Sequence, residues 1–290
     1  MLTGRSILHV KQGPGRSFVP KAIEGYFNDL TNKVLKDRKT LEDGVLPKMQ
    51  NDNGEYVVFA TTIFQYGLGC YDLFLQRKEP KYLEQFRKCL DWALANQDRN
   101  GGWDISTVAG CKSPYGAMAQ GEGVSLLLRG YTFFKDKDYF EAAKRGVDLM
   151  LRPLEDGGTS YYEEDGLILM EFMDTPTVLN GWIFALFGLY DFSIVCPEPY
   201  YRKSFKRSLL TLKKSICSFD TGYWSKYNAG KSIASPFYHK LHIAQLISLS
   251  LIDRDERVWE DYRNRFERYL RNPFYRIKAF AIKVYQKVSE

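Results

Sequence analysis

Four long apolar segments recur along the chain at a spacing of about sixty residues, and this spacing limits the possible folds more than any other feature. The segments begin near Val58, Met118, Val178 and Tyr238, and each follows a Gly-rich or aromatic loop. A repeat of this length fits a hairpin of two helices, and successive hairpins can stack side by side and close into a toroid. Because every hairpin returns the chain to the same rim, the loops before the four segments should converge on one mouth. We therefore expect any functional site at that rim.

Helical periodicity supports this interpretation, because apolar residues recur at intervals of three and four. The segments with this pattern are 57–76, 81–97, 116–135, 138–151, 177–193, 201–217, 237–253 and the Arg-rich C-terminal residues. Pro80, Pro197 and Pro199 fall between the two helices of a pair, where a proline can begin a helix but could not lie inside one. Strand-like alternation is almost absent outside short loop hairpins.

The pattern predicts an all-α fold, an (α/α) toroid or barrel of helical hairpins with short β-hairpin loops on one rim. Residues 1–56 are expected to form an N-terminal extension and the first helix of the toroid. Residues 57–290 are expected to form the (α/α) barrel catalytic domain, and the whole chain one structural domain. Gly69 and Gly188 occupy equivalent positions in near copies of one motif, YGLGCYD and LFGLYD. Since glycine weakens a helix by about 1 kcal/mol, tight packing between inner helices is its natural explanation.

Composition excludes several classes of protein. The five cysteines are scattered without C-x-x-C spacing, which is typical of reduced thiols in a cytosolic protein and does not indicate a zinc site. The N-terminal residues contain no apolar core long enough for a signal peptide, and no later run is long and uncharged enough to span a membrane. We expect a soluble, cytoplasmic chain that uses no metal and no cofactor.

The formal net charge is +6, with basic residues crowded in 202–214 and in the last forty positions. A solvated helix face explains most of this charge. The sharper interpretation is attraction to a polyanion. No nucleic-acid-binding motif accompanies the charge, so an acidic polysaccharide is a better candidate partner than a nucleic acid.

Polar and aromatic residues gather in the loops and helix starts expected at the rim. They are Trp103, Tyr115, Gln120, Glu122, Glu171, Asn180, Tyr223, Trp224, Tyr227, Tyr238, His239 and His242. Glycoside hydrolysis would need two facing carboxylates, for example Glu171 with Glu122. Abstraction of a proton next to a carboxylate fits better, because it needs one base, an acid on the other face, and groups that stabilise the enediolate. Glu171 and the phenols of Tyr227 and Tyr238 could serve, with Arg129, Lys231 or His242 among the groups that could supply charge or hydrogen bonds.

Structural explanations exist for the same residues. A tyrosine near a helix start is commonly a packed aromatic with one satisfied hydroxyl. His239 and His242 could share a helix face, but no carboxylate motif accompanies them, so they do not indicate a metal site. Trp103 could plug the end of the barrel, and Arg129 could pair with a buried acid.

Five ordered motifs resemble a known family. They are NQDRNGGWDI (96–105), SPYGAMAQGEGVSLLLRGY (113–131), the segment 171–191 with its VLNG core, DTGYWSKY (220–227) and SPFYHKLHIAQL (235–246). Together they resemble the C-terminal catalytic domain of D-glucuronyl C5-epimerases, which turn glucuronate into iduronate within heparan-type glycans. The resemblance implies an (α/α) barrel, proton transfer by Glu171 and Tyr238 on opposite faces of the substrate, and assistance from Tyr227.

The remaining candidates are expected to bind substrate. They are Trp103, Tyr115, Gln120, Asn180, Tyr223, Lys231, His239 and His242. Of these, Gln120, Asn180 and His242 match family positions and could equally be scaffold residues. The chain departs from the animal enzymes at Phe172, where they have tyrosine, and at Gly230, where they have arginine, and both departures bear on carboxylate recognition and hence on the substrate. The expected form is a stand-alone catalytic domain of the bacterial sort.

The predicted function is therefore a uronic-acid C5-epimerase, an isomerase that acts on glucuronate-type residues of a polysaccharide without a cofactor. A polysaccharide lyase would share the carbanion but expel the C4 group, and a glycoside hydrolase could use the same toroid. A non-catalytic domain that binds acidic glycan is the third alternative. A homodimer is one oligomeric state that the sequence allows.

Overall fold

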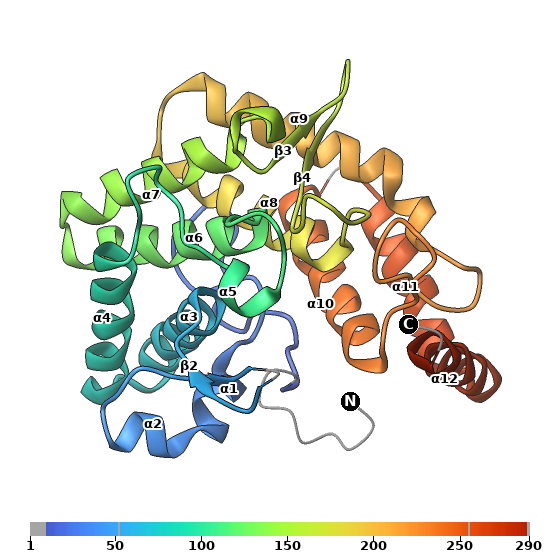
Figure 1. Ribbon diagram of the computed structural model, residues 1–290, viewed down its shortest axis with the longest axis horizontal. Helices are drawn as coiled ribbons and strands as arrows, with labels where there is room; N and C mark the ends of the chain where they lie inside the picture. Colours follow the sequence, from blue (N-terminus) through green and yellow to red (C-terminus); the bar gives the residue numbers. More distant parts are fainter. Residues whose placement is uncertain (1–9, 52, 255, 289–290) are drawn as a thin grey trace.

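Each of the four repeated apolar segments forms the inner helix of a hairpin. The structure of the protein is a computed structural model that describes residues 10–51, 53–254 and 256–288. The inner helices are α3 (Ala60–Arg77), α6 (Ala117–Phe134), α8 (Leu179–Val195) and α10 (Pro236–Ile252). Their outer partners are α4 (Pro80–Ala95), α7 (Lys137–Leu151), α9 (Pro199–Ser215) and α11 (Val258–Arg271). Each outer helix packs on the inner helix that precedes it, which confirms the predicted (α/α) toroid (Figure 1).

Local signals in the sequence set most helix boundaries. Pro80 and Pro199 stand at the first position of α4 and α9, as their missing N–H groups allow. Lys78 and Lys135 end α3 and α6 in the left-handed conformation. The inner helix α8 is the most apolar, and its residues 179–193 are all buried. Inner helices therefore form the core, and amphipathic outer helices shield them.

The inner helices α6 and α8 cross at close range. A Cβ atom on Gly188 would lie 2.3 Å from the carbonyl oxygen of Gly121, so only glycine permits this contact. Further along these helices, Arg129 of α6 pairs with Asp191 of α8 at 2.6 Å, and both side chains are fully buried. The structural explanation of Arg129, pairing with a buried acid, is thus confirmed.

The N-terminal segment fills the space between the first and last inner helices. It carries α1 (Thr31–Lys36), α2 (Arg38–Glu42) and the strands β1 (Met49–Gln50) and β2 (Tyr56–Val57). The Phe27 ring stacks on Phe187 of α8 at 4.1 Å, and its carbonyl oxygen accepts a hydrogen bond from the Ser248 hydroxyl of α10. Helix α1 packs on α3. The predicted division into residues 1–56 and 57–290 stays a prediction. Residues 1–9 of the first segment and 289–290 of the second lie outside the described residues.

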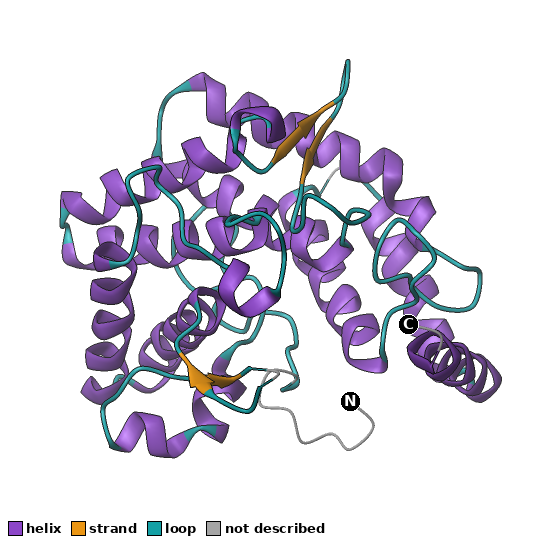
Figure 2. Cartoon of the chain, viewed as in Figure 1, coloured by secondary structure: helices purple, strands orange, loops and turns teal. Residues whose placement is uncertain are grey.

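Strands form only two short antiparallel hairpins in the described part of the chain (Figure 2). One joins β1 to β2, and the other joins β3 (Ser160–Tyr162) to β4 (Leu167–Leu169) ahead of α8. The short helix α5 (Ser106–Ala109) precedes α6. The last helix, α12 (Pro273–Val288), lies outside the ring beside α11. None of the helices among the described residues has the length and apolarity needed to cross a bilayer.

Candidate active site

A cavity of about 330 Å³ opens where the first turns of all four inner helices meet. Thr61 of α3, Met118 of α6, Asn180 of α8 and Tyr238 of α10 line it. The loops before these helices add Glu171 and Tyr227, together with other residues. The predicted convergence at one rim therefore brings Glu171, Tyr227 and Tyr238 to one cavity, although they belong to different repeats.

Two glycines at helix starts position Glu171. Its carbonyl oxygen lies only 2.3 Å from where a Cβ of Gly116 would stand, and the Met170 carbonyl accepts a hydrogen bond from Ala117 N. Its carboxylate covers the first turn of α8, where a Cβ on Gly181 would come within 2.0 Å of Glu171 Oε2. Neither glycine could be another residue without moving Glu171.

The Glu171 carboxyl is poorly solvated. The residue as a whole is half-buried, yet Oε2 is closed off from solvent and has no hydrogen-bond partner within the described residues. Burial raises the pKa of Glu171 to about 8. A carboxyl of this kind exchanges a proton near neutral pH, as a general acid or base must.

Tyr227 and Tyr238 face this carboxyl as a pair. Their ring centroids lie 4.8 Å apart. Burial raises the pKa of both phenols, and the negative charge of Glu171 raises both further. A hydrogen bond between the two side chains raises the pKa of Tyr227 and lowers that of Tyr238, which is about 12. The two phenols are therefore linked by a hydrogen bond, and burial keeps both of them protonated near neutral pH.

Backbone contacts hold the two tyrosines in place. The carbonyl oxygen of Tyr227 accepts a hydrogen bond from Leu179 N at the start of α8, and Tyr227 N donates to Ser232 O. Tyr238 lies in the first turn of α10, where the hydroxyl of the N-cap residue Ser235 accepts from its N–H. Such a side-chain cap satisfies one of the donors that a helix start leaves open.

Lys33 of α1 adds a cation that sequence reasoning missed. It lines the cavity and is buried. Burial lowers the pKa of Lys33 to about 8, and the nearby charge of Glu122 opposes that shift. Glu122 in turn is buried behind the cavity, where its Oε1 accepts a hydrogen bond from Gln65 at 2.7 Å. Lys33 lies outside the motif region and resembles an ordinary solvated lysine in the sequence, so only the tertiary structure shows its position.

Three predicted substrate-binding residues lie in packed structure outside the cavity lining. Trp103 is buried, donates from Nε1 to the carbonyl oxygen of Ala93, and meets Phe64 edge-on at 5.0 Å. Gln120 is buried and donates to Trp103 O at 3.4 Å. The Tyr115 hydroxyl donates to Asp98. Trp103 thus packs between the first two helical hairpins, and none of these three residues belongs to the proposed site.

The two predicted histidines share one serine. The Ser225 hydroxyl lies 2.8 Å from His239 Nδ1 and 2.9 Å from His242 Nδ1. His239 Nε2 lies 3.0 Å from the Phe266 carbonyl oxygen and therefore carries the proton, so its Nδ1 accepts. Burial lowers the pKa of His239 to about 4 and that of His242 to about 3. Both rings are neutral and buried, and we assign them to the scaffold behind Tyr227.

The other two predicted residues face α12. Lys278 lies 4.0 Å above the Tyr223 ring, and Gln286 donates to the Lys231 carbonyl oxygen at 2.8 Å. Asn180, in contrast, lines the cavity, and its Oδ1 has no partner among the described residues. The described part of the chain contains no group of three His, Cys, Asp or Glu side chains that could hold a metal ion.

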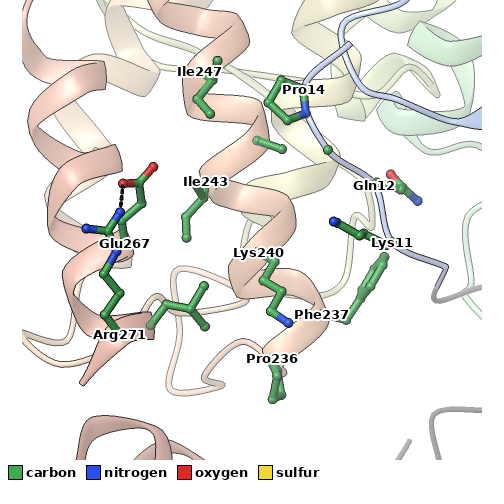
Figure 3. Close-up of a pocket in the computed structure, with 13 residues that line it drawn as sticks. Lys11, Gln12, Pro14, Pro236, Phe237, Lys240, Ile243, Ile247, Glu267 and Arg271 are labelled. Carbon is green, nitrogen blue, oxygen red and sulfur yellow. Dashed lines mark hydrogen bonds and ion pairs between the residues drawn. The ribbon is translucent and has the colours of Figure 1, made fainter. Parts of the chain in front are cut away.

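A second cavity of about 620 Å³ adjoins the first and shares Gln12 and Phe237 with it. It runs along α10 between the N-terminal segment and α11 (Figure 3). Its floor is apolar, and three cations, Lys11, Lys240 and Arg271, stand at its edges. The acid Glu267 pairs with Arg271 at 3.2 Å, so the groove keeps a positive charge from the two lysines.

Fold and cavity together define a helical-toroid protein with a carboxyl group and a phenol pair at one rim. Residues 97–268, more than half of the chain, match the family described as D-glucuronyl C5-epimerase C-terminus, and the chain belongs to this family. The chain is 28% identical to the D-glucuronyl C5-epimerase of Caenorhabditis elegans over 210 residues. That match covers 62% of this chain and 34% of the worm protein. The chain spans about a third to a half of the length of the curated relatives it matches.

Solved structures share the fold at low sequence identity. The Lin0763 protein from Listeria innocua has a TM-score of 0.57 and 10% identity, with 82% of this chain and 63% of that chain covered. The GH76A alpha-1,6-mannanase from Salegentibacter sp. HEL1_6 has a TM-score of 0.50 and 17% identity, with 82% and 67% covered. A polysaccharide lyase has a TM-score of 0.50 and 13% identity, with 88% and 77% covered. These likenesses concern the fold alone.

Proposed function

We propose that this chain removes and returns the proton at C5 of a uronic acid residue within an acidic polysaccharide. The observation that carries the proposal is the buried Glu171 carboxyl facing the hydrogen-bonded pair Tyr227 and Tyr238 in one cavity. Membership of the epimerase family supports the reaction class. The worm relative is named for this activity, and the substrate assigned to the present chain is part of the proposal.

The reaction needs a base on one face of the sugar and an acid on the other. In one direction the Glu171 carboxylate takes the proton from C5, and the electrons of the C–H bond pass into the adjacent carboxylate as an enediolate. Tyr238 then gives its proton to the opposite face of C5, and Tyr227 stabilises the phenolate through its hydrogen bond. In the reverse direction the two groups exchange roles.

Lys33 is proposed to hold the sugar carboxylate. An enediolate carries more negative charge on these oxygens than the ground state, so a cation placed there lowers the barrier. Lys33 lines the same cavity as Glu171, inside a poorly solvated region where its charge acts strongly. Asn180 is proposed to bind a sugar hydroxyl through its unpartnered Oδ1.

The adjoining groove extends the proposal from a single sugar to a polymer. It leads out of the cavity past Gln12 and Phe237, and Lys11 and Lys240 stand where neighbouring acidic sugars would lie. The half-buried Phe237 ring offers a surface on which a sugar can stack. Charge and an apolar floor together suit an acidic glycan chain.

Deuterium exchange tests the proposal. A uronate oligosaccharide incubated in heavy water should gain deuterium at C5, and Glu171→Gln and Tyr238→Phe should each lower the rate at least a hundredfold. Tyr200→Phe is the matched control, because Tyr200 is an exposed tyrosine on α9, and it should leave the rate unchanged. Lys240→Glu should slow exchange on long oligosaccharides and spare the shortest ones.

Other products would identify the alternatives. An unsaturated uronate would identify a lyase, and new reducing ends without deuterium would identify a hydrolase. Tight binding of acidic oligosaccharides without exchange would identify a glycan-binding domain. No exchange across a broad panel of uronate glycans would refute the epimerase proposal.

A further inference from the structure

The last helix exposes an apolar face that the other described residues leave uncovered. Six large apolar side chains on α12 are between 36% and 83% exposed. They are Phe274, Ile277, Phe280, Val284, Tyr285 and Val288. Elsewhere among the described residues, exposed large apolar side chains are spread over several elements, with no second helix that carries so many.

Helix α12 has two apolar faces, and only one is docked. Tyr275, Ala279 and Ile282 lie on one side and pack against the body of the protein. Gln286, on the same side, donates to Lys231 O and accepts from Ile233 N, which fixes the helix against that loop. At 3.6 residues per turn the six exposed side chains fall on one continuous stripe that points away from this docked side.

The charge of α12 is entirely positive. Arg276, Lys278, Lys283 and Lys287 belong to the helix, which contains no Asp or Glu. On the helical wheel, Lys278 borders the exposed stripe on one side, and the other three cations border it on the opposite side. An apolar stripe flanked by cations is typical of helices that lie in the interface of a membrane.

We propose that the exposed face of α12 docks on an anionic lipid surface. The apolar side chains would enter the boundary between headgroups and acyl chains, and the flanking cations would contact anionic headgroups. The helix would lie along the surface, with its docked side kept against the rest of the protein. A second copy of the chain fits this face less well, because two such helices would bring like charges together without an acid to offset them.

The docked side of α12 relates this surface to the cavity. Gln286 binds the loop at Lys231 and Ile233, and that same loop carries Tyr227. Lipid contact would therefore lie next to one wall of the cavity. The proposal stands independently of the reaction, because it rests only on the exposure and charge of α12.

Vesicle sedimentation of the full chain tests the proposal. The protein should sediment with vesicles of phosphatidylcholine mixed with phosphatidylglycerol, and much less with phosphatidylcholine alone. Raising the salt from about 0.1 M to about 1 M should weaken binding, because the screening length falls from about 10 Å to about 3 Å. Lys287→Ala should weaken partitioning about fivefold.

Variants within the stripe separate lipid docking from self-association. Ile277→Glu and Phe280→Glu should each weaken vesicle binding at least tenfold, since each places a charge on the buried side of the interface. Leu210→Glu is the matched control, because Leu210 is an exposed apolar residue on the basic helix α9, and it should bind as wild type. Unchanged melting temperatures would show that all three variants fold.

Two results would overturn the proposal. One is absence of binding to anionic vesicles by the folded protein. The other is a concentration-dependent dimer in sedimentation equilibrium that Phe280→Glu abolishes while vesicle binding stays unchanged. In a positive result, a tryptophan placed by Phe280→Trp should shift its fluorescence to shorter wavelength when anionic vesicles are added.

Discussion

Gly181→Ala should disable the proposed site without removing any of its chemical groups. In an ordinary helix this substitution is favourable by about 1 kcal/mol. Here the new Cβ would stand 2.0 Å from Glu171 Oε2, whereas ordinary contacts begin at 3.4 Å, so the carboxylate must move by more than 1 Å. A displacement of that size costs on the order of a hundredfold in rate. We expect C5 exchange to fall by about that factor while stability changes little.

A double-mutant cycle tests whether Gly181→Ala acts by displacing the Glu171 carboxylate. Exchange in heavy water is measured for Gly181→Ala, Glu171→Gln and the double variant, together with their melting temperatures. If Gly181→Ala acts only through the carboxylate, it should cost almost nothing further in the Glu171→Gln background. Exchange within threefold of wild type in folded Gly181→Ala would show that the position of Glu171 does not matter. Additive losses would show that the glycine acts by another route.

Three further predictions concern charge. Lys33→Met should raise KM for a uronate oligosaccharide at least tenfold in steady-state kinetics, and Lys33→Arg should recover part of the loss, because the cation is proposed to hold the sugar carboxylate. Arg129→Leu should lower the free energy of unfolding by about 3–5 kcal/mol in urea titrations, because Asp191 would stay buried without its cation. The double variant Arg129→Leu with Asp191→Leu should recover most of this loss. Burial raises the pKa of Glu122 from 4.5 to about 8. Between pH 4.5 and about 8 the native state therefore binds more protons than the unfolded state, so the free energy of unfolding should fall as the pH rises through this window. Glu122→Gln should flatten that fall by on the order of 1 kcal/mol per pH unit in pH-dependent unfolding; equal slopes for the two proteins would contradict it.

Lipid docking and the reaction can fail separately. A chain that exchanges C5 protons but ignores vesicles would keep the proposed reaction and lose the role of α12. A chain that binds anionic vesicles without exchanging protons would do the reverse. The two measurements therefore test different surfaces of the molecule.

The helical hairpins and their order can be predicted from local sequence patterns alone. Periodicity of apolar residues is a local property. A proline at the start of a helix and a left-handed residue such as Lys78 at its end are also local signals, because each acts on the backbone next to it. Even so, the helix predicted at residues 57–76 begins only at Ala60, because Val57 pairs with Met49 in a strand. That pairing depends on a partner outside the local pattern.

Which polar residues face the cavity depends on tertiary contacts and cannot be predicted from local patterns. Trp103 and Glu171 both follow turns and both belong to family motifs, yet packing between the first two hairpins buries the tryptophan, whereas the carboxyl of Glu171 lines the cavity. Lys33 enters the cavity because α1 packs on α3, a contact that leaves no periodic trace in the sequence. The sequence also does not show which apolar face of α12 is exposed, because its helical wheel has two apolar faces and only one of them packs against the protein. Local propensity fixes where helices form, whereas burial depends on which surfaces meet, and that is a property of the closed ring.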